Sequence, residues 1–351
     1  MRTNILLAGF TLTALFSATT AFGADPRLLN LVMPDAATLA GANVTNAEIT
    51  PFGQYVLTQL TSSVNQELQT FVTATGFDPR RDISEILAAS SSNVTNPSGL
   101  VLAIGNFNVP QITTAITAKA PTQTVQTYDG ATLFTSTHAK ANFALAFLGT
   151  NIAIVGDIAS VKAAIDRSPN ANSINPALAV QVQTLSTTED AWVVTNSPIT
   201  SLIPVLGAPS APPATGTATP APVSPFAGMF SSIQGSSGGV KFGTNVQITG
   251  QVLTTDAASA TSLANVLQAL VSIASMAGGQ DPQIAILAQI LQGMKVTADG
   301  TTINVALSIP ETQVETILNN MKNQAKPAAR PALRPAIAPR EHRAPAAVQQ
   351  Q

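Results

Sequence analysis

The residues with the most potential for chemistry are the charged side chains of GFDPRRDISEI, residues 76–86. Charged residues make up only 10% of the chain, and this stretch is its most heavily charged segment. Its charged members are Asp78, Arg80, Arg81, Asp82 and Glu85. Guanidinium forks match carboxylate and phosphate groups, so Arg80 and Arg81 are a candidate anion-recognition pair. A carboxylate pair such as Asp78 with Asp82 is the kind of arrangement that performs acid–base chemistry on sugars.

The same stretch can also be interpreted as a structural joint, which is the interpretation we favour. Apolar residues at helical spacing predict a helix over 51–75, and Gly76 is placed to end it. Asp78 then caps locally and Pro79 fixes the next φ angle, which opens a turn. In a joint the two arginines point outward or pair with nearby acids. The anion-recognition pair is the alternative.

The second part of the stretch predicts a short capped turn. Asp82 is expected to cap its start, with Glu85 three residues later in the spacing of a capping box. Ile83, Ile86 and Leu87 would then face the core.

Histidine and cysteine are scarce. The chain has no cysteine, which excludes disulfides, thiolate metal sites and a cysteine nucleophile. His138 is the only histidine before the tail, and its place at the end of a predicted hairpin strand favours a surface residue. GSSGG at 235–239 fits the G-x-S-x-G pattern around Ser237, but its glycines precede a predicted strand and the only later histidine is in the tail. We predict no catalytic, cofactor-binding or metal-binding residue.

A second carboxylate pair is formed by Glu189 and Asp190. Neither carboxylate pair is flanked by the aromatic residues of a sugar platform, and aromatic residues total only 5%. The single tryptophan, Trp192, alternates with Val194 in a predicted strand. This pattern favours core packing over ligand stacking.

Charge is distributed unevenly along the chain. Residues 24–321 carry 9 Lys and Arg against 17 Asp and Glu, whereas residues 322–351 carry 6 basic residues and one acid. An acidic body argues against nucleic-acid binding, which uses a basic face. The basic tail has three interpretations: it contacts an anionic envelope polymer or membrane surface, it contacts the acidic body, or it is a solvated tether. Its arginines are Arg330, Arg334, Arg340 and Arg343.

The N-terminus has the pattern of a secretory signal. Arg2 supplies the positive charge, an apolar run follows over 5–22, and the small residues Ala21 and Gly23 predict cleavage before Ala24. The alternative is an uncleaved membrane anchor. We therefore expect a secreted or periplasmic protein.

One supersecondary unit recurs in the body. Residues 143–167 predict strand, tight turn, strand and helix, and residues 240–270 and 295–321 repeat this order. In the last of these, Asp299 and Gly300 form the hairpin turn. The predicted fold class is α+β, with antiparallel strands, helices on one face of the sheet, and two related strand-hairpin-helix halves.

Composition divides the chain into five parts. Residues 204–225 are rich in Pro, Ala and Thr and predict a linker, and the Pro/Ala/Arg-rich end predicts a disordered tail. The predicted parts are a signal peptide (1–23), a first α+β half (24–203), the linker (204–225), a second α+β half (226–324) and the basic tail (325–351).

Four segments resemble a family of exported bacterial proteins of unknown function. They are DPRLLNLVMPDAATLAGANV (25–44), PFGQYVLTQL (51–60), ATGFDPRRDISEIL (74–87) and GDIASVKAAIDR (156–167). The resemblance implies a secreted or periplasmic protein with the recurring strand–helix layout. It brings no activity, cofactor or catalytic residue.

The sequence therefore predicts a non-enzymatic binding or structural protein of the bacterial envelope, with an unidentified ligand and no cofactor. The scarcity of histidine, cysteine and aromatic side chains leaves little with which to build an active site. The alternative is a hydrolase-type enzyme whose carboxylates come together only in the folded structure.

Overall fold

The computed structural model describes residues 23–62, 66–93, 98–119, 123–136, 142–170, 174–197, 231–277, 290 and 293–324. It divides into two compact units, Met1–Glu311 and Thr312–Gln351. The described part of the second unit belongs to helix α14 (Glu311–Gln324). Several predictions concern residues outside the described ranges: residues 1–22, His138, the linker, Arg330, Arg334, Arg340 and Arg343.

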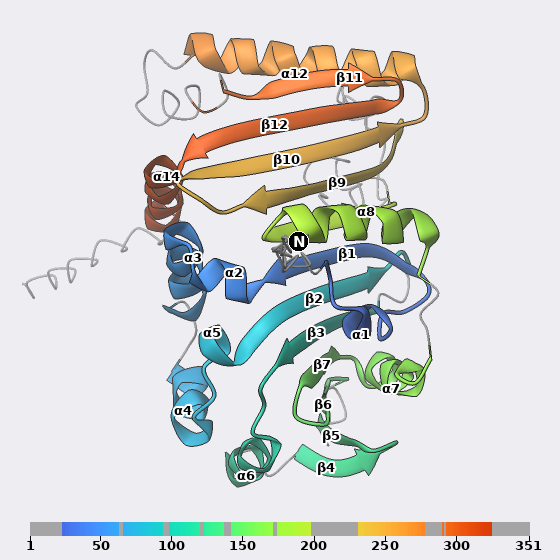
Figure 1. Cartoon of the computed structure of the whole chain (residues 1–351), viewed down its shortest axis with the longest axis vertical. Helices are drawn as coiled ribbons and strands as arrows, with labels where there is room; N and C mark the ends of the chain where they lie inside the picture. The colour runs from blue at the N-terminus through green and yellow to red at the C-terminus, as the bar shows by residue number, and fades with distance from the viewer. Residues whose placement is uncertain are drawn as a thin grey trace, which may run out of the picture. The chain divides into compact units, whose positions relative to one another are not determined.

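The first unit is built on one antiparallel sheet of twelve strands (Figure 1). Their spatial order is β11-β12-β10-β9-β8-β1-β2-β3-β7-β6-β5-β4. Their bounds are β1 (Ala36–Asn43), β2 (Ile83–Ser91), β3 (Gly99–Gly105), β4 (Gln123–Tyr128), β5 (Ala131–Ser136), β6 (Ala144–Leu148), β7 (Ile152–Gly156), β8 (Ala191–Thr195), β9 (Ile233–Lys241), β10 (Asn245–Thr254), β11 (Lys295–Asp299) and β12 (Thr302–Pro310). This sheet confirms the α+β class.

The helices of the first unit connect and cover these strands. Their bounds are α1 (Pro26–Leu29), α2 (Val44–Glu48), α3 (Pro51–Ser62), α4 (Gln66–Thr75), α5 (Pro79–Asp82), α6 (Val109–Lys119), α7 (Ile158–Arg167), α8 (Pro176–Thr188) and α12 (Ala257–Ala277). None of the described helices is long and apolar enough to cross a membrane.

Strands from both predicted halves share the single sheet. β8 pairs with β1 on one side, where Thr195 lies opposite Thr38, and with β9 on the other, where Val194 lies opposite Ser237. β1 and β8, the first and last strands of the predicted first half, are therefore neighbours at the centre of the sheet. The strands of the predicted second half continue the same sheet from β9 outward. The related-halves prediction stays a prediction.

Helices pack against both faces of the sheet, rather than against one. Leu133 and Phe134 are neighbours in β5, so their side chains point to opposite faces. Leu133 joins the main core together with residues of α7 and α8. Phe134 joins a second core together with residues of α4 and α6. The physical reason is that these strands are apolar on both faces, which is the pattern of a sheet buried on two sides.

The local turn and cap predictions are confirmed at several positions. Asp129 and Gly130 both have positive φ (43° and 79°), as the two-residue turn between β4 and β5 requires. Between β11 and β12 the predicted Asp299–Gly300 turn is shifted by one residue: Asp299 lies in β11 opposite Thr302, so Gly300 (φ 56°) and Thr301 form the turn. Asp157 caps α7 by accepting a hydrogen bond from the Ser160 N–H at 2.9 Å.

Candidate functional site

The charged stretch lies where α4 ends, α5 forms one turn and β2 begins. Gly76 has φ 65°, and its N–H donates to the Val72 carbonyl at 2.8 Å, which closes the C-terminus of α4. Asp78 then caps α5, because its Oδ1 accepts from the Arg80 N–H at 3.0 Å. The glycine end and the Asp78 cap were both predicted from the sequence.

Asp82 does not cap a following turn, as predicted, but bonds back to the start of α5. Asp82 is the last residue of α5, and its Oδ2 accepts from the Asp78 N–H at 2.8 Å. The predicted capping box with Glu85 is wrong, because β2 begins at Ile83 and Glu85 lies within that strand. The predicted core residues are also divided: Leu87 joins the main core, while Ile83 packs against the second. Regular alternation would put these two residues on one face, and the register shift between Ile83 and Glu85 in the pairing with β3 interrupts it.

Both arginines are paired with carboxylates of the same short segment. Arg80 donates through Nε (3.1 Å) and Nη2 (2.9 Å) to Asp78. Arg81 donates through Nε (2.7 Å) and Nη2 (2.8 Å) to Asp82, and Nη2 also reaches the Gly76 carbonyl at 2.8 Å. The Nε–Nη2 edge of each guanidinium, the edge best suited to a carboxylate, is therefore occupied by the protein itself.

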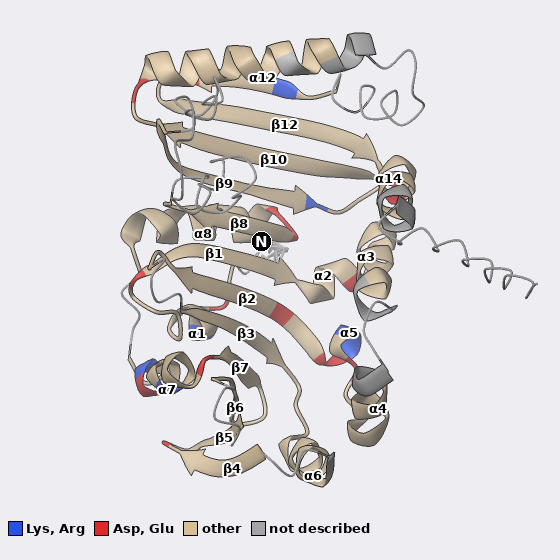
Figure 2. Cartoon of the chain, turned by 180° about the vertical axis from the view of Figure 1, so that it is seen from behind, with Lys and Arg blue, Asp and Glu red and all other residues tan. Residues whose placement is uncertain are grey.

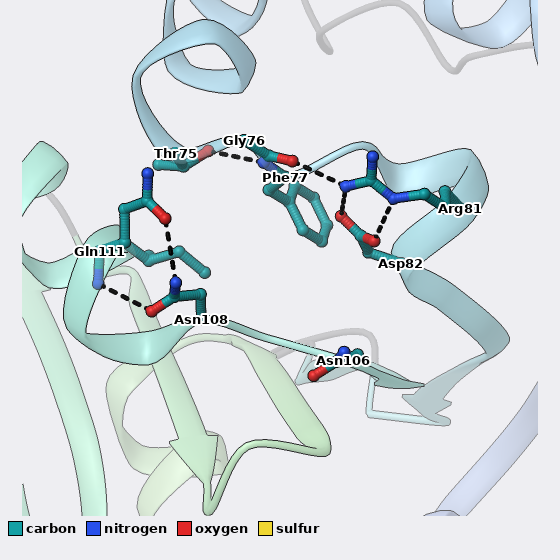
Figure 3. Close-up of a pocket in the computed structure, with 9 residues that line it drawn as sticks. Thr75, Gly76, Phe77, Arg81, Asp82, Asn106, Asn108 and Gln111 are labelled. Atoms are coloured by element: carbon teal, nitrogen blue, oxygen red, sulfur yellow. Dashed lines mark hydrogen bonds and ion pairs between the residues drawn. The ribbon is translucent and has the colours of Figure 1, made fainter.

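A polar pocket of about 230 Å³ opens beside Arg81 (Figure 3). It lies between the end of α4, the loop at Gly76, α5, the segment after β3 and the start of α6. Its lining residues are Thr75, Gly76, Phe77, Arg81, Asp82, Asn106, Asn108, Gln111 and Ile112. We call this the Arg81 pocket.

The amide side chains of the Arg81 pocket differ in how many hydrogen bonds they make within the protein. Asn108 caps α6: its Oδ1 accepts from the Gln111 N–H at 3.2 Å, and its Nδ2 donates to Gln111 Oε1 at 3.0 Å. Asn106 is held by its backbone, whose N–H donates to the Asp82 carbonyl at 2.8 Å. The Asn106 side-chain amide makes no hydrogen bond to any residue that the structure describes (Figure 3).

Aromatic packing fixes the base of the pocket. The rings of Phe77 and Phe107 lie 5.8 Å apart between centroids, and Phe107 contacts Phe147 at 5.4 Å. Ile112, on α6, is buried. The polar groups of the pocket therefore lie next to packed apolar side chains.

A larger cavity of about 500 Å³ also has Arg81 in its lining. It is lined by Glu48, Gln54, Leu57, Thr58, Asp78, Arg80 and Arg81. Part of its wall is fixed by Gln54, whose Nε2 donates to the Glu48 carbonyl at 2.7 Å. Arg81 therefore lines two hollows of the surface.

The two aspartates that pair with Arg80 and Arg81 are held in their ionised forms. Hydrogen bonds from Arg80 lower the pKa of Asp78, and hydrogen bonds from Arg81 lower the pKa of Asp82. The same pairs raise the pKa values of both arginines. A general acid or base needs a pKa near the working pH, and these pairs shift the pKa values away from it.

The remaining sequence candidates lie apart from this site. Ser237 is buried inside β9, so the glycines around it lie within a strand and not before one. They allow close packing, since a β-carbon on Gly239 would overlap the side chain of Glu189. Asp190 is buried and accepts from Lys241 Nζ at 2.9 Å and from the Phe242 N–H at 2.6 Å. Trp192 is buried in the main core, as predicted.

The amides of the Arg81 pocket were not singled out from the sequence. The signal that points to two of them is Asn108 followed three residues later by Gln111, the spacing of a helix cap just before an apolar run. Asn106 has no such local signal, because its position depends on the contact between its backbone and Asp82.

Fold and site together define an α+β protein with a wide antiparallel sheet and a polar surface pocket. No family model and no curated protein matches the sequence. Among solved structures it is similar to TP0453 of Treponema pallidum. One crystal form has a TM-score of 0.50 at 9% identity, covering 84% of this chain and 98% of that chain. A second has a TM-score of 0.50 at 10% identity, covering 84% and 96%. At these identities the likeness shows the fold alone.

Proposed function

We propose that this chain is a non-enzymatic binding protein of the bacterial envelope, which takes a small polar ligand into the Arg81 pocket. The observation that carries the proposal is the side-chain amide of Asn106, which has no hydrogen-bond partner among the described residues and lines the same pocket as Arg81. A primary amide offers two donors and one acceptor. It is suited to a ligand group that both accepts and donates hydrogen bonds.

The ligand class follows from the hydrogen-bond donors of Arg81 that the protein leaves unused. Its Nε–Nη2 edge is bound to Asp82, and the adjacent carboxylate repels a free anion. Arg81 makes its hydrogen bonds through Nε and Nη2, so its Nη1 donors have no partner among the described residues. This combination favours a neutral amide or hydroxyl group, as found in peptides and amino sugars, over a dicarboxylate or phosphate. Anion recognition by Arg80 and Arg81 is the competing proposal.

Binding is favoured over catalysis by the electrostatics of the site. Each acid in the two hollows whose pKa is shifted has that pKa lowered by an arginine. The hydrolase alternative needs one carboxyl group with a raised pKa to act as the general acid. Neither Asp78 nor Asp82 meets this requirement.

The binding proposal is tested by titrating ¹⁵N-labelled protein with three probes: N-acetylglycinamide, N-acetylglucosamine and succinate. The side-chain amide signal of Asn106 should shift and saturate with at least one of the two neutral probes. Succinate should produce no saturable shift. Asn106→Ala should abolish binding. Asn304→Ala is the matched control, because Asn304 is an amide on β12 that pairs with Gln251 Nε2 at 3.1 Å.

Two outcomes contradict the proposal. If neither neutral probe gives a saturable shift, the pocket does not bind this class of ligand. If only succinate binds, and Arg80→Ala or Arg81→Ala removes that binding, the competing anion proposal is correct.

The export part of the proposal rests on the sequence of the N-terminus. We propose that residues 1–23 are a cleaved signal, that 204–225 is a linker, and that the basic tail from 325 onward contacts an anionic envelope polymer or membrane surface. Fractionation of cells expressing the full chain and a chain ending at residue 324 tests this. The full chain should sediment with the envelope, and the shorter chain should be released. Equal fractionation of the two contradicts the role of the tail.

A further inference from the structure

Glu85 is a carboxylate in an unusual place. The twelve strands carry four charged residues, and only Glu85 is not the first or last residue of its strand; β2 is paired along both edges. Figure 2 shows how few charges the sheet carries. Burial of this carboxyl raises its pKa. Among the described residues no cation lies within ion-pair distance of Glu85.

The group that meets Glu85 is the backbone at the start of the described chain. The Asp25 N–H donates to both carboxylate oxygens, at 3.1 Å to Oε1 and 3.3 Å to Oε2. The Asp25 side chain is turned away and pairs with Arg27, with Arg27 Nη2 at 2.8 Å from Oδ2. Asp25 and Arg27 are the charged groups that act on Glu85, and they act in opposite directions: Asp25 raises its pKa and Arg27 lowers it.

The segment around Asp25 is fixed to the body. A β-carbon on Gly23 would lie 2.8 Å from Ser186 Oγ and 3.3 Å from Thr187 Cγ2, so Gly23 lies directly against α8. Ala24 packs against the main core, and Leu28 is fully buried in it. Helix α8 contributes no charge here, because its sequence PALAVQVQTLSTT has no ionisable side chain. The predicted cleavage site is thus held beside Glu85.

We propose that hydrolysis of the Gly23–Ala24 peptide bond creates an α-ammonium group that forms an ion pair with Glu85, and that this carboxylate is a docking site for the processed N-terminus. The inference rests on the export part of the proposed function. Hydrolysis by a signal peptidase consumes one water, leaves the carboxylate on Gly23 and the α-amine on Ala24, and the amine takes up a proton.

Covalent geometry brings the new charge within reach. The Ala24 nitrogen is separated from the Asp25 nitrogen by three bonds, which places it within roughly 4 Å of that atom. Asp25 N is in turn 3.1 Å from Glu85 Oε1. The released terminus is free to turn about its own backbone bonds. A carboxylate that lacks a cation in the unprocessed chain gains one after processing.

The first measurement is the N-terminus of the exported protein. The full chain is expressed in an exporting bacterial host, recovered from the exported fraction and analysed by intact mass. The expected mass is that of a chain beginning at Ala24. An exported chain that begins elsewhere overturns this inference and leaves the binding proposal standing. A chain retained in the cytoplasm overturns export itself.

The second measurement follows the ion pair in the processed protein. Titration of the α-amine by NMR should give a pKa about one unit above the ordinary 7.7–8.0. Glu85→Gln should return it to that range. The glutamine still accepts from the Asp25 N–H, so the fold is retained.

Combining Glu85→Gln with acetylation of the α-amine separates the contribution of the ion pair to stability from that of side-chain packing. In the free-amine protein, Glu85→Gln should lower the urea midpoint of unfolding. In the acetylated protein the same substitution should leave the midpoint unchanged or raise it, because a buried carboxylate without a cation is then removed. An ordinary α-amine pKa, together with equal effects of Glu85→Gln in both forms, overturns the docking site.

Discussion

The indole of Trp192 lies directly over Gly41 on the neighbouring strand. The two residues face each other in the pairing of β8 with β1. A β-carbon built on Gly41 would lie 2.8 Å from the indole Nε1 and closer still to Cζ2 and Cε2. The ring occupies the space that any other residue would fill at this position. This contact joins β8 to β1 at the centre of the sheet.

Gly41→Ala should therefore destabilise the protein by about 1–3 kcal/mol, because the added methyl group forces the indole out of its position. Urea unfolding followed by the fluorescence of the single tryptophan measures this loss. Gly243→Ala is the matched control. Its new methyl group would meet only the Asn245 carbonyl oxygen, at 3.4 Å. A loss equal to that of the control contradicts the packing of Trp192 over Gly41.

The Asp190–Lys241 pair should respond unequally to removal of its two members. Asp190 is 2% exposed and Lys241 is 43% exposed. Lys241→Met leaves a buried carboxylate without its cation, whereas Asp190→Asn leaves an ammonium that water can reach. Each variant should lower the free energy of unfolding by roughly 1–3 kcal/mol, with the larger loss for Lys241→Met.

The double variant tests the coupling between these two residues. It should lose less stability than the sum of the single losses, by about 0.5–3 kcal/mol, because the interaction is removed only once. Chemical denaturation of the four proteins completes the cycle. Single losses that simply add would show that the two side chains act independently.

The sequence predicted the fold class and the Asp129–Gly130 turn, but two central strands were not recognised. β1 is AATLAGAN, whose small residues carry little of the β-branched and aromatic signal that marks a strand. Its glycine is explained only by Trp192, about 150 positions later. β2 follows directly on α5, so Asp82 and Glu85 had the spacing of a helix cap. The pairing of β2 with β1 and β3 overrides that local signal.

The site was predicted in part for a similar reason. The charged segment 76–86 and its turn were recognisable because Gly76, Asp78 and Pro79 act on their immediate neighbours. The Arg81 pocket also needs the start of α6, which the fold brings beside α5. Asn106 is positioned by a hydrogen bond from its backbone N–H to the Asp82 carbonyl. Because any residue except proline can make such a bond, the residue type at this position does not predict it.

The turn at α5 should depend more on Asp82 than on Arg80. Asp82 accepts from the Asp78 N–H and pairs with Arg81, whereas Arg80 pairs only with Asp78 and its side chain is 48% exposed. Asp82→Ala should lower the free energy of unfolding by about 0.5–2 kcal/mol, the usual effect of losing a cap. Arg80→Ala should have a smaller effect, since exposed ion pairs contribute little. An equal loss in both variants contradicts the capping role of Asp82.

The same carboxylate should make stability depend on pH in acid. Arg81 lowers the pKa of Asp82 in the folded state, so the stabilisation is present above the unfolded value near 3.9 and is lost as pH falls through the lower folded value. Asp82→Asn should therefore be less stable than the wild type at pH 7. The difference should shrink as pH falls below about 4 and vanish once Asp82 is protonated in both states. Urea unfolding of both proteins between pH 2 and pH 7 measures this convergence, and a difference that stays constant across the range would show that the charge of Asp82 does not stabilise the turn.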